Sequence, residues 1–272
     1  MTGDAGLHGQ LIINADDFGF DTDTSQATIE CFKAGALTSA TIMPNMPATE
    51  LATSFASNHD EFSYGIHLTF VCDTVERPIC PPDRIPALVR EDGRFLPSNH
   101  LRLKALAGAI PVDQIALETS AQIERILDCG IRVSHIDSHG HLHKFRPFIQ
   151  ALKVTLPRYG LEKVRNVQNL YMKKPLKSPT FWLGGVWRRQ ITRHFVTTPN
   201  FFMAASANDR QWVEWILRQD VRGVLEVGVH PGGPEHPDAW RNDERLACLE
   251  LAMKAKRAGW NLITWNGVQG IR

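Results

Sequence analysis

The sequence predicts one α/β domain spanning residues 1–272, built as a distorted (β/α) barrel with about seven or eight mainly parallel strands. Short β-rich runs alternate along the chain with segments whose apolar residues recur at helical spacing. The composition, 43% hydrophobic and 22% charged, is that of an ordinary globular protein. Several strand candidates also end in acidic or histidine residues, which fits a parallel barrel with its polar groups at one rim. A doubly wound open sheet is the alternative arrangement.

The first half of the chain holds four strand candidates separated by helix candidates. The strands are expected at 11–17, 38–44, 62–70 and 133–137. Helical spacing occurs at 24–36, 47–59 and 112–130. The last of these has the clearest apolar face, and Gly130 follows it as a helix terminator; the face consists of Ile115, Leu117, Ile123, Ile126 and Leu127.

The second half continues the alternation. Helices are expected at 144–156, 210–219 and 241–259, and strands at 163–167, 201–205, 223–230 and 261–265. Residues 71–112 interrupt the pattern with six prolines and no periodic run. Long irregular segments inside compact domains are often functional, so we expect 71–112 to be a lid or insertion loop.

Composition also limits the partners and the compartment. A net charge of +1 gives no general attraction to nucleic acid, so no nucleic-acid partner is expected. The N-terminal MTGDAGLHGQ lacks the apolar core of a signal peptide, and no run of eighteen apolar residues occurs. The five cysteines are scattered and form no CxxC pair, which is typical of free thiols in a reducing compartment. We therefore expect a cytoplasmic protein.

Residues 134–145, SHIDSHGHLHKF, contain four of the eleven histidines. In a strand, residues two apart share one face, whereas on a helix they do not. The spacing therefore predicts a strand face that carries five titratable groups, namely His135, Asp137, His139, His141 and His143.

Four strand candidates end in polar clusters: NADDFG at 14–19, GIHLT at 65–69, HIDSH at 135–139 and EVGVHPG at 226–232. Carboxylates and imidazoles that converge on one rim form a metal site or an acid–base site. Each cluster alone has a structural explanation, since aspartates can cap a helix and a histidine in a strand can belong to the core. Asp16 and Asp17 are adjacent, so both can face one site only if the chain turns there, and Phe18-Gly19 permits that turn.

Taken together, NADDFG, GIHLT, HIDSHGHLH and VGVHPG resemble the YdjC-like carbohydrate deacetylases, which include chitooligosaccharide and hopanoid-biosynthesis deacetylases. The resemblance runs from about residue 10 to residue 266. It implies a distorted (β/α) barrel and one divalent metal ion, Mg²⁺ or Zn²⁺, held by Asp17, His67 and His139. It also implies that Asp16 is the catalytic base and His230 the general acid.

These implied roles agree with the chemistry of amide hydrolysis. One carboxylate and two neutral imidazoles leave coordination positions open, and a metal lowers the pKa of its bound water. Attack by that water on an N-acetyl group would require a base such as Asp16 and an acid that protonates the leaving amine, such as His230. Asp137, His141 and His143 are expected on the substrate side. Asp137 could instead orient an imidazole, and the two histidines could be structural. From the residues alone, zinc, cobalt, nickel, magnesium and manganese all remain open.

Residues 163–208 carry eight Lys or Arg and no Asp or Glu. Within them, 181–195 would place five apolar residues near one helical side, with the arginines mostly off that stripe: Trp182, Val186, Trp187, Ile191 and Phe195. One interpretation is a helix that only packs on the barrel. The other assigns Trp182, Trp187 and Arg188 to a substrate with an apolar and an anionic part, such as a sugar phosphate or a glycolipid. An amphipathic basic helix could also contact an anionic membrane.

The leading hypothesis is a metal-dependent deacetylase of an acetamido sugar in an oligosaccharide, glycolipid or sugar phosphate. Another metal-dependent amide or phosphoester hydrolase on the same barrel is the first alternative, and a non-catalytic carbohydrate-binding protein is the second. The paired base and acid, Asp16 and His230, argue against binding alone. A homodimer is also compatible with the sequence.

Overall fold

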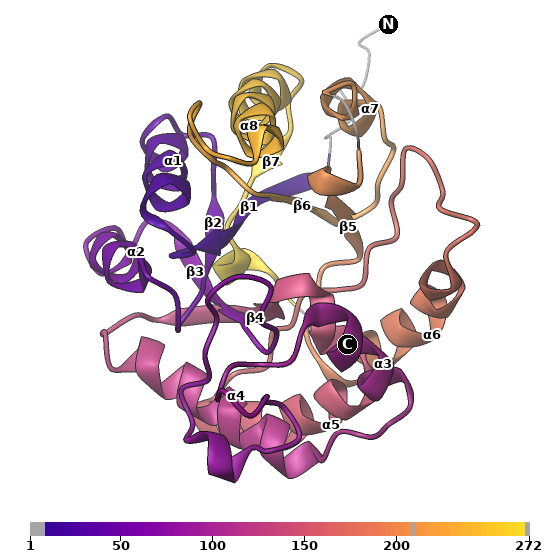
Figure 1. The fold of residues 1–272 in the computed structure, drawn as a ribbon. Helices are drawn as coiled ribbons and strands as arrows, with labels where there is room; N and C mark the ends of the chain where they lie inside the picture. Colours follow the sequence, from indigo (N-terminus) through magenta and orange to yellow (C-terminus); the bar gives the residue numbers. More distant parts are fainter. Residues whose placement is uncertain (1–8, 208–209, 270–272) are drawn as a thin grey trace, which may run out of the picture.

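The computed structural model describes residues 9–207 and 210–269 (Figure 1). Its centre is a single curled sheet in which every strand pairing is parallel, with the order β4-β3-β2-β1-β6-β5 and β7 paired to the start of β1. The strands are β1 (Gln10–Phe18), β2 (Ser39–Ile42), β3 (Ser63–Leu68), β4 (Val133–Ser138), β5 (Asn200–Met203), β6 (Val224–Val229) and β7 (Asn261–Leu262).

An irregular segment connects the two edges of this sheet. Val164 forms a parallel bridge with Ile136 of β4, and Lys163 forms one with Val196, which precedes β5. The amide of Val164 donates to the Val196 carbonyl, and the amide of Arg165 donates to the Ile136 carbonyl, both at 2.9 Å. The strand expected at 163–167 is therefore present only as isolated bridges. These bridges distinguish the distorted barrel from an open sheet and confirm the predicted fold class.

Helices surround the sheet on its outer side (Figure 1). They are α1 (Thr22–Lys33), α2 (Thr49–Ala56), α4 (Val112–Leu127), α5 (Arg146–Thr155), α6 (Pro179–His194), α7 (Trp212–Leu217) and α8 (Ala239–Arg257). Because helices cover the strands outside and side chains fill the interior, β2, β3, β4 and β6 are buried along their whole length. The apolar face of α4 is narrower than expected, since Ile115, Ile123 and Ile126 are buried but Leu127 is 37% exposed.

Residues 71–112 are more ordered than an irregular loop. They contain a 3₁₀ turn at Pro82–Arg84, an antiparallel bridge between Val89 and Phe95, and helix α3 (Ser98–Leu106). The segment is anchored by four fully buried side chains, those of Ile85, Leu88, Phe95 and Leu101. Burial of this kind favours a fixed insertion over a freely moving loop. Its function as a lid stays a prediction.

All five cysteines are unpaired within the described residues, and only Cys129 is exposed. The described helices include none with both the length and the apolar character needed to cross a membrane.

Candidate metal and catalytic site

Three of the predicted residues meet at the carboxyl end of the sheet. Asp17 Oδ1 lies 3.2 Å from His67 Nε2 and 3.0 Å from His139 Nδ1. These side chains come from the end of β1, from β3 and from the turn after β4, which are brought together because the strands are parallel. Their ligand atoms all lie within 4.8 Å of one another, as one cation would require. One carboxylate and two imidazoles form a donor set that suits a divalent metal ion.

The local backbone explains why Asp16 and Asp17 both face this site. Asp17 has a left-handed conformation, with φ of 58°, which Asp tolerates better than most residues. The β1–β2 register shifts between Ala15 and Phe18, as in a β-bulge. The chain therefore redirects at Asp17 and then turns at Phe18-Gly19 as the sequence suggested, since Gly19 has φ of 101° and the Phe20 amide donates to the Asp17 carbonyl at 2.9 Å. Neither aspartate caps α1, because Asp21 accepts the Thr24 amide there at 2.7 Å.

Asp137 orients His67. Its Oδ1 lies 2.7 Å from His67 Nδ1, and its Oδ2 accepts a hydrogen bond from Thr41 Oγ1 at 3.1 Å. If His67 Nδ1–H donates to Asp137, the lone pair of Nε2 faces Asp17 and His139, as a metal ligand requires. Burial lowers the pKa of His67, but Asp137, Asp17 and Asp16 together raise it to about 10. The position thus favours positive charge, whether a proton or a cation supplies it. Since Asp137 is fully buried, this geometry favours the orienting role over substrate contact.

A fully buried arginine organises the base of the site. Arg165 donates through Nη1 and Nη2 to the two carboxylate oxygens of Asp16 at 2.6 and 2.7 Å, and through Nε to Glu226 at 2.7 Å. Its Nη1 also pairs with Asp137. Burial raises the pKa of Asp16, but the Arg165 guanidinium, with His67 and His230, holds it below its usual range. Arg165 therefore links the expected base to the carboxylate that orients His67.

The histidine expected to be the acid lies beside Asp16. His230 Nε2 is 3.9 Å from Asp16 Oδ2, and Nδ1 is 3.2 Å from Glu244 Oε2 of α8. Glu244 also accepts the backbone amide of His230 at 2.7 Å. Burial lowers the pKa of His230, but Glu244 and the two aspartates raise it overall. A histidine held in this way can carry a proton near neutral pH.

Three residues of the site were not expected from the sequence, namely Arg165, Arg241 and Glu244. Arg241 of α8 donates through Nη2 to Asp17 Oδ2 at 2.7 Å, so the aspartate keeps Oδ1 toward the histidines. The guanidinium lies over the rings of Phe20 and Trp240. For Arg165 a signal existed, since it lies between Val164 and Val167 in the strand candidate KVRNV, and a charged residue is unusual in a buried strand. Arg241 and Glu244 lie on an ordinary charged helix and carry no such signal.

The predicted face of five titratable groups does not form. β4 ends at Ser138, and Gly140 and His141 take left-handed conformations with φ of 62° and 55°. His135 stacks instead on Trp265, with centroids 4.2 Å apart. His143 turns back so that its Nδ1 lies 2.8 Å from Ser138 Oγ. The alternation rule fails here because the strand stops before the histidines do.

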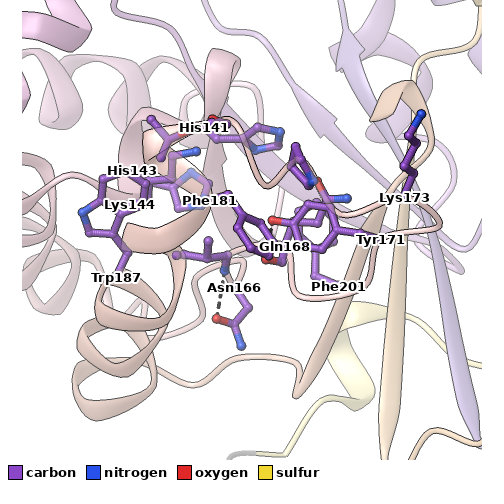
Figure 2. Close-up of a pocket in the computed structure, with 15 residues that line it drawn as sticks. His141, His143, Lys144, Asn166, Gln168, Tyr171, Lys173, Phe181, Trp187 and Phe201 are labelled. Atoms are coloured by element: carbon purple, nitrogen blue, oxygen red, sulfur yellow. Dashed lines mark hydrogen bonds between the residues drawn. The ribbon is translucent and has the colours of Figure 1, made fainter. Parts of the chain in front are cut away.

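A pocket of about 250 Å³ adjoins this turn (Figure 2). Of the expected substrate residues, His141, His143 and Trp187 line it, whereas Asp137, Trp182 and Arg188 do not. Its other lining side chains include Lys144, Lys173, Tyr171, Phe181 and Phe201, and none is acidic. Aromatic faces and cations are therefore present, although Arg188 is not among them; it donates to the Pro199 carbonyl instead.

The stripe predicted for α6 is partly wrong. Trp187 and Ile191 are buried, at 6% and 0% exposure, but Trp182 and Val186 lie on the opposite side and are 66% and 51% exposed. Phe195 lies just beyond the helix end at His194. The helix thus packs through the side of Trp187 and presents Trp182 outward.

Comparison with known proteins agrees with these motifs. A family model described as YdjC-like protein matches residues 10–259. A protein of Geobacillus stearothermophilus named carbohydrate deacetylase is 38% identical over 263 residues, covering 93% of this chain and 96% of that protein. One from Brevibacillus brevis with the same name is 28% identical over 225 residues, covering 82% and 81%. A solved structure from Enterococcus faecalis V583, provisionally named a cellobiose-phosphate cleavage protein, has the same fold, with a TM-score of 0.74 and 22% identity over 95% of this chain and 98% of its own. The chain belongs to the YdjC-like protein family.

Proposed function

We propose that this protein is a metal-dependent hydrolase that removes the N-acetyl group from an acetamido sugar. The observation that carries the proposal is the convergence of Asp17, His67 and His139 beside the Asp16–His230 pair. Relatives named carbohydrate deacetylase support the same reaction. A protein that only binds sugar could use the metal ligands or the aromatic pocket. It would not need a carboxylate and a histidine 3.9 Å apart, such as Asp16 and His230.

Each residue has a distinct task in this proposal. Asp17, His67 and His139 hold the cation, and Asp137 and Arg241 orient two of them. The metal, when bound, acidifies water and polarises the amide carbonyl. Asp16 accepts the proton of the attacking water, and Arg165 keeps its carboxylate ionised and fixed.

His230 completes the reaction on the other side. Amines leave poorly unless they are protonated, and Glu244 favours the protonated imidazole that can supply this proton. Asp16 and His230 thus act at successive stages, one accepting and one donating.

The pocket beside His141 and His143 is the proposed sugar subsite (Figure 2). Tyr171, Phe181 and Trp187 offer rings on which a pyranose can pack, and Lys144 and Lys173 add positive charge without a lining carboxylate. This lining favours a substrate with an anionic part, as in a sugar phosphate or a glycolipid, over a neutral oligosaccharide.

The test is acetate release from a panel of acetamido sugars, with protein as purified, after chelation, and after adding back Mg²⁺ or Zn²⁺. The panel pairs a neutral di-N-acetyl disaccharide with its phosphate ester, and released phosphate is measured in parallel to detect phosphoester cleavage. We expect acetate alone, lost on chelation and restored by metal.

Two histidine variants control for the site assignment. His139→Ala should lose bound metal and activity, whereas His100→Ala, an exposed histidine on α3, should keep both. Metal content and circular dichroism are measured on both variants, because an unfolded protein would also lose its metal and only a folded, metal-free variant shows the loss of a ligand. Full activity of metal-free His139→Ala protein would exclude this site.

A further inference from the structure

The outer side of α6 carries a stripe of mixed apolar and cationic side chains. Trp182, Val186, Arg189 and Arg193 are spaced i, i+4, i+7 and i+11, which aligns them along one side of a helix, and all four are exposed. Trp182 is 66% and Val186 51% exposed, while Trp187 and Ile191 attach the opposite side to the barrel. Exposed tryptophan is costly in water, so a cluster around one calls for an explanation.

The loop before α6 extends the same surface. Leu176 is 57% exposed, and its carbonyl accepts a hydrogen bond from Trp182 Nε1 at 3.0 Å, so loop and helix are joined at this point. Lys173, Lys174 and Lys177 surround Leu176 in the sequence and are exposed. We call Leu176, Trp182, Val186, Arg189 and Arg193, with these three lysines, the α6 face.

The cations of the α6 face lack partners of opposite charge. Residues 163–207 contain no Asp or Glu, and in the part of the chain that the structure describes no carboxylate pairs with these lysines and arginines. A groove between α5 and α6 continues the positive charge, since its lining includes Arg146, Lys153, Arg189, Arg193 and His194 and no acid. The net charge of the whole chain is only +1, so this charge is concentrated locally.

Apolar side chains flanked by unpaired cations match one surface in particular. We propose that the α6 face docks on an anionic lipid bilayer, with Trp182, Val186 and Leu176 entering the interface and the lysines and arginines contacting lipid phosphates. Tryptophan favours the interfacial region of bilayers because its ring is apolar and its N–H is polar. Nucleic acid would use the cations but not Val186 or Leu176, and two copies of this face would repel each other.

Docking here would place the sugar pocket near the membrane. Phe181 lines the pocket and is the neighbour of Trp182 on α6, with ring centroids 5.4 Å apart. In Figure 1, α6 lies at the periphery of the barrel, and it packs beside α5. The membrane contact does not depend on the proposed deacetylase activity, because the α6 face contains none of the metal-binding or acid–base residues.

Flotation of the full-length protein with vesicles tests this proposal. We expect binding to vesicles of equal parts phosphatidylglycerol and phosphatidylcholine, weak binding to phosphatidylcholine alone, and release by salt. Arg189→Gln with Arg193→Gln should weaken the partition coefficient by about 30-fold, since each cation near an anionic surface contributes roughly a factor of five. Trp182→Ser with Val186→Ser should weaken the partition coefficient by at least about tenfold, because two apolar side chains would no longer be buried in the membrane interface.

Matched controls come from elsewhere on the surface. Leu103→Ser removes an apolar side chain that is 66% exposed on α3, and Arg125→Gln with Arg132→Gln removes two exposed cations at and after α4. These variants should bind like the parent, and circular dichroism checks that all variants fold. Failure of the parent to bind anionic vesicles, or equal weakening by the control variants, overturns the proposal. The proposal also fails if the α6 variants still bind vesicles but lose another interaction of the parent. That interaction would be an oligonucleotide shift in a gel or a dimer in sedimentation.

Discussion

Two regions of the molecule differ in how their positive charges are paired. One is the group of charged side chains at the strand ends around Arg165, which we call the rim, and the other is the α6 face. Arg165 is 0% exposed and meets three carboxylates, those of Asp16, Asp137 and Glu226. Arg193 is exposed and meets none among the described residues. Burying a charge costs several kcal/mol unless partners compensate it, so the rim requires its partners, whereas the α6 face does not.

This difference separates two uses of charged residues. In the rim, each contact restrains another group: Arg165 fixes Asp16, Asp137 fixes His67, and Arg241 fixes one oxygen of Asp17. Such a network is useful for chemistry because catalysis depends on groups held in place before the substrate arrives. On the α6 face no described carboxylate pairs with the cations, which fits the proposed contact with a surface outside the chain.

The largest effect is expected from the rim itself. Asp16→Asn removes the proposed proton acceptor and should lower turnover by about 10²–10⁴-fold, the usual contribution of a general base. Bound metal should remain, because Asp17, His67 and His139 are unchanged. Steady-state acetate release and metal content are measured on the same sample. His230→Ala should show a loss of similar size.

A loss of less than about tenfold in either variant would reject the role assigned to that residue. Since the Asp16→Asn substitution also weakens the pairing with Arg165, thermal unfolding is recorded alongside. A protein that has simply lost its fold would lose metal as well, and this outcome is separate from the loss of a base.

A second prediction compares how much one arginine in each region contributes to the free energy of unfolding. Arg165→Gln leaves three buried carboxylates without their cation and should lower the free energy of unfolding by about 3–5 kcal/mol. Arg193→Gln, the same change on the α6 face, should alter it by less than about 0.5 kcal/mol, as for most surface substitutions. Urea unfolding of both variants gives the two values. Similar values would mean that the rim network does not depend on Arg165.

The strand-end clusters could be predicted because a parallel sheet gathers the ends of its strands on one side. Asp17 and His139 are 122 residues apart, yet this rule alone was enough to place them together. Arg165 was missed because its contacts depend on the bridges that join 163–165 to β4 and to Val196, and no local pattern encodes those. The histidine face was wrong because Gly140 and His141 leave the strand conformation.

The two faces of α6 show a related limit. Trp182 and Trp187 are both large and apolar, and helical spacing alone cannot say which of two adjacent stripes meets the barrel. The contact of Trp187 with Phe145, at 5.0 Å between centroids, decides it. Phe145 precedes α5, so this information comes from tertiary packing.

Lys144 lies between these two extremes. It is partly buried, between Arg165 and Arg193 in exposure, and like Arg193 it has no carboxylate partner among the described residues. Its ammonium lies 5.2 Å from the Trp187 ring and 5.9 Å from that of Phe145, and these ring contacts partly replace an ion pair. Burial, with a smaller contribution from Arg102, lowers the pKa of Lys144 to about 8.

The smallest of these effects is a pH-dependent gain in stability from Lys144→Met. A lysine whose pKa is lower in the folded than in the unfolded state favours the fold only when it is neutral, so stability is lost as pH falls from the unfolded value toward about 8. The lowering of the pKa corresponds to about 3 kcal/mol, and the ring contacts that the lysine makes offset about 1 kcal/mol of it. Methionine fills similar space without charge, so at about pH 7 the variant should be more stable by roughly 2 kcal/mol. At about pH 10 the lysine is mostly neutral in the folded state but still largely charged in the unfolded state, so the gain should fall to about a quarter of its value at pH 7. Urea midpoints at both pH values measure it. An equal difference in stability between variant and parent at both pH values would contradict this prediction. It would show that Lys144 is paired, like Arg165, or solvated, like Arg193.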